Sequence, residues 1–590
     1  MNYPKYKALA FLCMICIFFS CKTDPKQDTT KFKRTDNSVI VRMEVDADQL
    51  FPLFGKSVYD SQVNGQLYNH LVGFDSRNKT FVPELTKEMP KTRKIRDQSS
   101  QTRVAYDFEI LEEAVWANGS PVTGHDFLAT MKVLFNPLVD AARTREVLAM
   151  EISDIQVDEE NPKKLTVVGS QETYLSLKNI SNAVPVLPAY ILDPEGKLER
   201  INFSDLTNPE QAEKLAKNNQ DLQNIALRIN SADFTKSLEN LVGSGPYTLT
   251  EWQPGQKIAL QKKANWWGDK ISETTHPTLR AYPEAIDYKP IVNEATALAA
   301  LKLQEIDALN RPDNNEFKAL QENASINQVF NFETTSAAAV YFIMLNTTNP
   351  KLSDKRVRQA LAHALDVDEV LNTVYAGYGQ RVANPLHPDQ SYYHDGLAVI
   401  KPDIQKAKAL LAAAGWEDTN DNGIVDKVIE GATVDLTIDY MIVSKRATTL
   451  NSALLFKDQA KRVGIDLNIS QVESSVFGTK RESRDFEAMS AGSGLTPNWN
   501  PRQRWYSNGA SNYMGFGTAK TDALIDEVLT NFSSEERTVL YKELQSIIYE
   551  EQPLIMLWVP TIPVIVSKRF EYDLTSDPPY YEPRFFMLKE

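Results

Sequence analysis

The sequence predicts a multidomain protein of the α/β or α+β class. Strand-like and helix-like stretches alternate along the whole chain, and no repeat of fixed period is visible. The 590 residues allow about two to four domains of roughly 100 to 200 residues each. Apolar residues make up 42% and charged residues 24% of the chain, which is ordinary for a globular protein with its own core.

Short apolar or alternating runs predict the strands, and turn residues such as Gly119-Ser120-Pro121 separate them from the next element. The expected strands cover 39–45, 104–111, 165–169, 247–252, 257–262, 434–440 and 465–472. Near the C-terminus an apolar stretch over 554–566 is broken by Pro560 and Pro563.

Helices are expected between these strands, and two of them carry clear end signals. Thr123 is placed to cap the second helix, with Asp126 where a helix N-terminus favours an acid. Gly415 ends another helix as a C-terminal cap. The expected helices cover 60–71, 126–135, 294–304, 354–365, 401–414 and 535–550, and a polar stretch over 209–240 is also helical in character.

Residues 1–20 are predicted to be an export signal. Two lysines precede an apolar run over 8–19, which is too short for a membrane span of roughly 20 residues. The run ends in a small residue followed by Cys21, and this ending resembles a bacterial lipobox. The resemblance implies cleavage before Cys21, acylation of its thiol, and a polar tether over 21–37. The alternatives are an ordinary cleaved signal and a buried apolar strand.

Cysteine usage and net charge limit the chemistry of the mature chain. The other two cysteines, Cys13 and Cys16, lie inside the expected signal, so disulfides, thiolate metal sites and cysteine nucleophiles are excluded downstream. The net charge of −14 and the lack of a basic patch argue against nucleic acid as a partner.

Six sequence blocks, in order along the mature chain, resemble one family. That family is the solute-binding proteins of peptide-type ABC importers, the oligopeptide, dipeptide and nickel group known as family 5. The blocks are QLYNHLVGFD (66–75) with VPEL (82–85), YDF (106–108) with VWANGSPVT (115–123), GSGPY (243–247) with WWG (266–268), LNT (345–347) with DKRVRQA (354–360), AKALLAAAGW (407–416), and 522–526 with 540–545.

The resemblance implies an α/β, two-lobed periplasmic-binding-protein-like fold with an extra subdomain inserted in lobe one. It also implies a monomeric receptor that closes on peptides or other oligomeric solutes by hinge motion and delivers them to an ABC permease. The receptor would sit on the periplasmic side of a bacterial cell envelope, anchored through its N-terminal lipid. The expected ranges are 38–74, 183–293 and 516–590 for lobe one, 75–182 for the inserted subdomain, and 294–515 for lobe two.

The family resemblance also locates a candidate ligand loop. Peptide binders of this family show a W.aDYpdP segment whose Asp meets the α-ammonium group of the ligand. The matching stretch is LTPNWNP (495–501), where Pro497 stands in place of that Asp. A buried ammonium without a carboxylate costs several kcal/mol, so a free peptide N-terminus is not the expected anchor. Asn498, Trp499 and Asn500 are therefore predicted to contact the ligand; the alternative is a structural loop in which Trp499 packs.

Four other residues are further candidates for ligand contact. Asn512 and Tyr513 lie in a stretch that resembles the family's n.sgy.n cleft loop. Tyr68 and Asn346 stand at positions that face either the cleft or the core.

No metal or other cofactor is expected. Asp418, Asn420, Asn422 and Asp426 match part of a calcium loop, but Ile429 occupies the position that needs a bidentate Glu. A polar turn is the alternative, and a tight calcium site is not predicted. The six histidines show no paired spacing that would favour nickel.

Motifs of common enzyme classes are absent from the sequence. It contains no GxSxG elbow, no HExxH and no Walker loop, so catalysis is not predicted. The alternative functions are a non-transporting peptide sensor or chaperone of the same fold and a secreted hydrolase.

Overall fold

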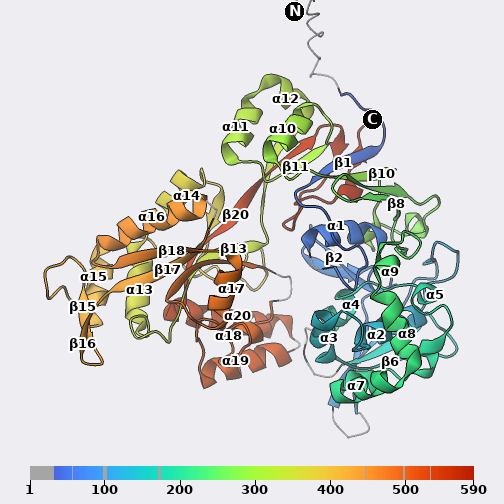
Figure 1. Cartoon of the computed structure of the whole chain (residues 1–590), viewed down its shortest axis with the longest axis horizontal. Helices are drawn as coiled ribbons and strands as arrows, with labels where there is room; N and C mark the ends of the chain where they lie inside the picture. Colours follow the sequence, from blue (N-terminus) through green and yellow to red (C-terminus); the bar gives the residue numbers. More distant parts are fainter. Residues whose placement is uncertain are drawn as a thin grey trace, which may run out of the picture.

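The computed structural model describes residues 32–590 except 56, 97–101, 170–172, 174–175, 445–446, 496–498 and 532. The expected signal and Cys21 lie outside these residues. The described chain forms two lobes, and both ends of the described chain lie on lobe one, in the upper part of Figure 1. Within the described residues, no helix combines the length and apolar character needed to cross a bilayer.

Lobe one is built on one half of a long mixed sheet, in the order β20-β11-β1-β10-β9-β8. The central strand β1 runs parallel to both of its neighbours, whereas β9 is antiparallel to β10 and β8. The elements are β1 (Ser38–Met43), β8 (Tyr247–Gln253), β9 (Lys257–Lys262), β10 (Ala285–Pro290), β11 (Ala308–Asn310), β12 (Phe330–Ser336), α1 (Val58–Leu67), α10 (Glu294–Lys302), α11 (Asn314–Glu322) and α12 (Ala324–Val329). The expected strands at 39–45, 247–252 and 257–262 are confirmed within two residues.

The inserted subdomain has its own antiparallel sheet, in the order β4-β5-β7-β6, and a separate hairpin of β2 and β3. Its helices lie at the lower right of Figure 1. The elements are β2 (Val72–Asp75), β3 (Thr80–Pro83), β4 (Lys91–Arg96), β5 (Thr102–Glu109), β6 (Ile152–Val157), β7 (Lys164–Gly169), α2 (Gly124–Phe135), α3 (Ala142–Ala149), α4 (Ser176–Asn182), α5 (Ala189–Leu192), α6 (Ser204–Thr207), α7 (Pro209–Asn218), α8 (Gln220–Ile229) and α9 (Ala232–Lys236).

The start of α2 confirms the predicted cap. The backbone N–H of Thr123 donates to Asp126 Oδ2 at 2.8 Å, and the helix begins at Gly124. The other carboxylate oxygen of Asp126 accepts the N–H of Ala189 at 2.8 Å. One acidic side chain therefore caps the start of α2 and holds α5 beside it.

The packing of α2 extends the inserted subdomain beyond its expected end at 182. Phe135 of α2 meets Phe203 with ring centroids 4.9 Å apart. Asn136 Nδ2, at the end of the same helix, donates to the carbonyl of Leu222 in α8 at 2.9 Å. The helices α5 to α8 thus pack with the inserted subdomain, although 183–293 was assigned to lobe one by resemblance.

Lobe two carries the other half of the long sheet, in the order β18-β17-β19-β13-β20, with helices on both faces. The elements are β13 (Ala339–Leu345), β14 (Gly379–Arg381), β15 (Asp426–Ile429), β16 (Ala432–Asp435), β17 (Thr437–Val443), β18 (Asp466–Val472), β19 (Ala488–Gly494), α13 (Lys355–Ala364), α14 (Val367–Val374), α15 (Ile404–Ala413), α16 (Ala447–Lys461), α17 (Ser474–Glu482), α18 (Arg502–Trp505), α19 (Ala519–Thr530) and α20 (Ser534–Glu551).

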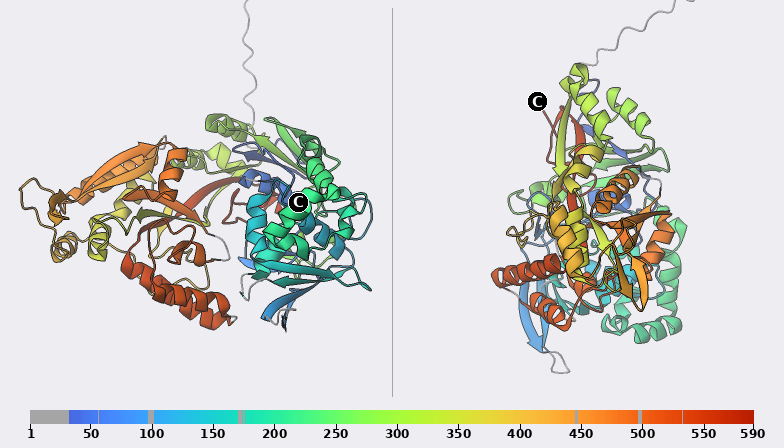
Figure 2. Two further views of the ribbon diagram at one scale, coloured as in Figure 1. Left: turned by 60° about the horizontal axis from the view of Figure 1, so that its bottom comes forward. Right: turned by 90° about the vertical axis from the view of Figure 1, so that its left-hand side faces the viewer.

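One strand, β20 (Leu554–Ser567), runs through both lobes. It appears in red between the two halves of the molecule in Figures 1 and 2. Its first part pairs with β13 and its last part with β12 and β11. The strand continues through Pro560 and Pro563, and Pro560 accepts the N–H of Ala337 at 2.9 Å, where β12 passes into β13. The lobes are thus joined by two antiparallel crossings that are hydrogen-bonded to each other.

The strand pairings place the division between the lobes differently from the expected ranges. Residues 294–336 pack on the lobe-one part of the sheet, because α10 to α12 share a core with β12 and Ile565. Residues 519–551 pack on lobe two, because Leu544 and Ile548 of α20 share a core with Phe342 and Met344. Lobe two therefore spans about 339–559 rather than 294–515, and this boundary depends on contacts between segments far apart in the sequence.

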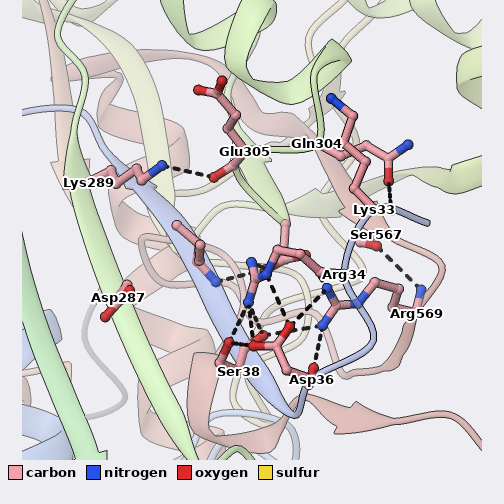
Figure 3. A network of polar contacts seen from close by, with 12 residues as sticks. Lys33, Arg34, Asp36, Ser38, Asp287, Lys289, Gln304, Glu305, Ser567 and Arg569 are labelled. Carbon is pink, nitrogen blue, oxygen red and sulfur yellow. Dashed lines mark hydrogen bonds and ion pairs between the residues drawn. The ribbon is translucent and has the colours of Figure 1, made fainter. Parts of the chain in front are cut away.

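A cluster of charged groups fixes the segment before β1 to lobe one (Figure 3). Arg34 donates to Asp36 and, at 3.0 Å, to Asp307 Oδ2. Arg569, just after β20, donates to the carbonyl of Asp36 at 2.6 Å. The buried carboxylate of Asp307 also accepts the N–H of Ile40 at 2.8 Å. The cluster thus joins the chain before β1, the start of β11 and the end of β20.

Candidate functional site

Three cavities lie along the end of β19, and two of them are lined by residues from both sides of the boundary between the lobes. Residues 490–492 line a large cavity of about 720 Å³, and residues 493–495 line a small cavity of about 190 Å³. Leu495 also lines a third cavity of about 490 Å³, here called the hairpin cavity because the β2–β3 hairpin forms one of its walls. Gln390 is shared by the small and the hairpin cavities. An extended solute could therefore lie along the end of one strand.

Aromatic side chains form much of the lobe-two wall of the large cavity. Trp558 of β20 packs against Tyr341 at 6.1 Å and against Tyr375 at 4.8 Å between ring centroids. The absence of a side chain at Gly379 leaves room for the indole of Trp558, because a Cβ at that position would lie 2.9 Å from the Trp558 ring. Burial raises the pKa of Tyr440, so its phenol stays neutral. The wall offers flat apolar faces with hydrogen-bonding edges.

Arg311 lines the large cavity from lobe one. It follows β11 with a φ of +51°, and its N–H donates to the carbonyl of Pro563 at 2.9 Å. Its side chain is exposed, and among the residues that the structure describes its guanidinium forms no ion pair or hydrogen bond. The backbone geometry thus holds a positive charge opposite the aromatic wall.

The hairpin cavity is closed by a contact between the inserted subdomain and lobe two. Lys79, in the turn between β2 and β3, forms an ion pair with Asp389 and holds the pKa of that carboxyl below its ordinary value. His387 lies beside this pair, with Nε2 2.9 Å from Ser336 Oγ, and burial lowers the pKa of its imidazole. The two lobes therefore meet through polar contacts that leave room for a solute between them.

Comparison with known proteins identifies the family that shares this architecture. Residues 80–515 match the family model described as "Bacterial extracellular solute-binding proteins, family 5 Middle". This match covers well over half of the chain.

The chain belongs to solute-binding protein family 5.

Two curated relatives and one solved structure show the range of this family 5 chain's similarities. It is 27% identical to the oligopeptide-binding protein AppA of Bacillus subtilis over 56% of the chain and 59% of that relative. It is 24% identical to heme-binding protein A of Haemophilus influenzae over 54% of the chain and 54% of that relative. The chain thus matches less than two thirds of the length of either relative. The structure of Bacillus subtilis AppA in complex with a nonapeptide superposes with a TM-score of 0.65 at 21% identity, covering 94% of this chain and 100% of that one.

The comparisons confirm the predicted fold and function class. The two-lobed periplasmic-binding-protein fold is shared with the solved structure. Family 5 proteins bind solutes and are not enzymes, so the family assignment agrees with the prediction that the chain is a binding protein.

In this family 5 protein the predicted loop residues lie at the small cavity. Trp499 and Asn500 line it, while Asn498 and Pro497 lie outside the described residues. The indole of Trp499 packs against the ring of Tyr541 at 5.2 Å, and the Tyr541 hydroxyl donates to the Trp499 carbonyl at 2.7 Å. Trp499 thus packs in an aromatic stack that also borders the hairpin cavity, and ligand contact by this loop stays a prediction.

Two other predicted ligand contacts, Tyr68 and Asn346, are instead buried in the core. Tyr68 is 2% exposed, and burial raises its pKa. Asn346 donates to the carbonyls of Arg484 and Phe486, and its Oδ1 accepts from Thr348. The amide of Asn346 is hydrogen-bonded within the protein, and Tyr68 lies in the apolar core. Both side chains therefore stabilise the fold rather than face a solute.

Asn512 belongs to the same buried group, whereas Tyr513 does not. Asn512 is 1% exposed; it donates to the carbonyls of Tyr506 and Phe516 and accepts the N–H of Phe516. Tyr513 is half-buried, and the guanidinium of Arg481 lies 4.9 Å from its ring centroid. Tyr513 packs against the lobe-two core and stays a predicted ligand contact.

The calcium-like segment forms a turn held by its own side chains. Asp418 accepts the N–H groups of Asn422 and Gly423 at 3.1 and 3.0 Å, and Asn420 Oδ1 accepts the N–H of Asn422. The buried Asp426 accepts from Thr419. These oxygens therefore bond within the turn that leads into the β15–β16 hairpin. Among the described residues, no three His, Cys, Asp or Glu side chains are grouped as a metal site.

Sequence reasoning missed Arg311 and the aromatic wall. Arg311 lies at the end of a three-residue strand, which gives little periodic signal. Trp558 stands inside an apolar run that is typical of core. The one available signal was Gly379, where a glycine in a strand indicates close approach by another group.

Proposed function

We propose that this chain captures peptides or related oligomeric solutes between its two lobes and delivers them to an ABC permease. The observation that carries the proposal is the line of three cavities that β19 follows, of which the large cavity and the hairpin cavity have walls from both sides of the inter-lobe boundary. Such a site suits a long solute better than a compact one. The similarity to AppA, whose name and structure report oligopeptide binding, supports peptides as the solute class.

The proposal includes hinge closure about the paired crossings of β20 and the β12–β13 connection. Few residues link the lobes, so a small change in backbone angles there would move lobe two as a unit. Contacts such as Lys79 with Asp389 join the lobes through exposed polar groups. Such contacts form and break at low cost, which suits a site that must load and release.

The proposal also includes attachment to the periplasmic face of a membrane through lipid on Cys21. The support is the sequence of the first 37 residues, since Cys21 lies outside the described residues. Stable attachment needs more than one acyl chain, as an N-terminal lipoprotein cysteine provides.

The test is to purify the full chain without denaturation and identify the molecules that elute with it by mass spectrometry. Peptides in stoichiometric amount are expected, and their removal by unfolding and refolding should increase the radius of gyration measured by X-ray scattering. A different solute class would contradict the peptide assignment, and an unchanged radius would contradict closure. Loss of peptide uptake in cells that lack the gene would support delivery to a permease.

A further inference from the structure

Two arginines without adequate anionic partners lie together on lobe two. Arg481 is in α17 and lines the large cavity, and Arg504 is in α18 and lines the small cavity. The ring of Tyr513 lies under the Arg481 guanidinium, 4.9 Å from it. The end of β19 passes both cavities, at residues 490–492 and 493–495. The two charges thus face adjoining parts of one site.

Arg504 is half-buried yet unpaired. Its guanidinium lies 5.8 Å from the centroid of the Phe342 ring, and within the described part of the chain it forms no ion pair and no hydrogen bond. Arg502, two residues earlier in the same short helix, differs: it is exposed and pairs with Asp526. The exposed Arg502 therefore has a carboxylate partner, whereas Arg504, which lines the small cavity, has none among the described residues.

Arg481 is only weakly paired. Its nearest carboxylate is that of the adjacent Glu482 at 4.0 Å, and its Nε is buried without a hydrogen-bond partner in the described structure. Glu473 lines the same cavity and already has an interaction partner of its own. Within the described residues Arg504 has no ion pair, and Arg481 has only this long contact with Glu482.

The electrostatics of this pair favour an incoming anion. Burial lowers the pKa of Arg504, and the nearby charge of Arg481 lowers it further. Two like charges held partly out of water destabilise the empty protein, and an anion between them would remove that cost. The guanidinium fork matches the two oxygens of a carboxylate or phosphate.

We propose that Arg481 and Arg504 bind an oxyanion group of the solute, a carboxylate or a phosphate, at the junction of the large and small cavities. This inference rests on the proposed function and narrows its substrate class to acidic solutes. Tyr513 positions Arg481 through its ring, and Arg311 adds a further positive charge from lobe one to the same cavity.

The probe is a tryptic digest of casein, whose peptides carry carboxylates and phosphoserines. Refolded, solute-free protein is mixed with this digest, separated by gel filtration, and the retained peptides are quantified by mass spectrometry. The digest is used untreated, after amidation of its carboxylates, and after phosphatase treatment. The variants are Arg504→Gln and Arg481→Gln, and Arg502→Gln is the matched control.

The wild-type protein and Arg502→Gln should retain the same acidic peptides from the untreated digest. Arg504→Gln should bind them about thirtyfold more weakly, and Arg481→Gln should also bind them more weakly. Retention should fall after amidation if the group is a carboxylate, or after phosphatase if it is a phosphate. Arg504→Gln should melt at or above the wild-type temperature, because it removes an unpaired charge; if it fails to fold, Arg481→Gln decides.

Equal retention by the wild type and a folded Arg481→Gln or Arg504→Gln variant would overturn the inference but leave the proposed function intact. Equal retention of the untreated digest and of a digest both amidated and dephosphorylated would do the same. If the wild-type protein retains no peptide, the peptide assignment fails. The co-purifying solute then decides the inference, since a solute without carboxylate or phosphate overturns it.

Discussion

Replacing Gly243 with alanine should destabilise lobe one strongly. A Cβ at this position would lie 1.9 Å from the carbonyl oxygen of Leu67 and 2.7 Å from the Tyr68 ring, so backbone must move. The Leu67 carbonyl also accepts the N–H of Gly245 at 2.9 Å, and the Gly243 carbonyl accepts from Lys263 Nζ at 2.6 Å. The GSGPY motif thus provides the close approach of these two segments.

The expected magnitude is set by these contacts. Overpacking of a tight core costs about 1–3 kcal/mol, and each of the two hydrogen bonds contributes about 1 kcal/mol. The substitution should therefore lower the free energy of unfolding by about 4 kcal/mol. At about 2 °C per kcal/mol for a large domain, the melting temperature should fall by roughly 8 °C.

The measurement is thermal unfolding followed by circular dichroism, with Gly65→Ala as the matched control. Gly65 lies inside α1, and a Cβ there would meet nothing within 4 Å. Alanine at that position should stabilise the helix by about 0.5–1 kcal/mol. If Gly243→Ala melts within about 2 °C of the wild-type protein, the argument from close approach is refuted.

Four further predictions concern Trp499, the calcium-like turn, Cys21 and Lys263. Trp499→Ala should weaken binding of the co-purifying solute and also lower stability, because the indole packs on Tyr541, whereas Trp499→Phe should keep most of both; calorimetry and melting curves measure these effects. Calorimetric titration should show no tight calcium binding, because Asp418 and Asn420 already bond to backbone N–H groups. Cys21→Ser should yield protein that no longer partitions with membranes, measured by sedimentation. Burial lowers the pKa of Lys263 to about 8 from its ordinary value of 10.5. The unfolded chain binds more protons between these values, so wild-type stability relative to Lys263→Met should rise from pH 8 to 10 in urea titrations.

Each of these has a contrary outcome. Unchanged affinity in Trp499→Ala would assign the indole to packing alone. Micromolar calcium binding that Asp418→Ala abolishes would restore a metal site. Membrane-bound, palmitate-labelled Cys21→Ser would move the lipid elsewhere, and a stability difference that stays flat from pH 8 to 10 would mean that Lys263 titrates at its ordinary pKa.

Local signals in the sequence were sufficient for much of the fold. The pattern of Thr123 and Asp126 places the start of α2 because a helix cap depends on residues a few positions apart. The path of β20 was not accessible in this way. Its prolines break the local pattern, yet the strand continues because it changes partners near them, from β13 and β14 to β12 and β11.

The site was harder to predict because burial and pairing are tertiary properties. The sequence predicts Asn346 and Asn512 as ligand contacts because their side chains are polar. In the structure their amides instead donate to backbone carbonyl groups, those of Phe486 and Phe516. The sequence alone does not distinguish Arg502 from Arg504. Only the fold shows that Arg502 forms an ion pair with Asp526. Resemblance located the loop at Trp499 beside a cavity, but it could not indicate that the indole packs on Tyr541.

The paired crossings between the lobes limit how the two bodies can turn relative to each other. A single linking segment would act as a swivel and allow rotation about every axis. Two strands side by side, joined by the hydrogen bond from Ala337 to Pro560, resist twisting and sideways shear. They leave bending of the ribbon as the one soft rotation. Under the proposed hinge closure, lobe two would return to the same register with lobe one after each opening, and no search over orientations would be needed to re-form a site built from both.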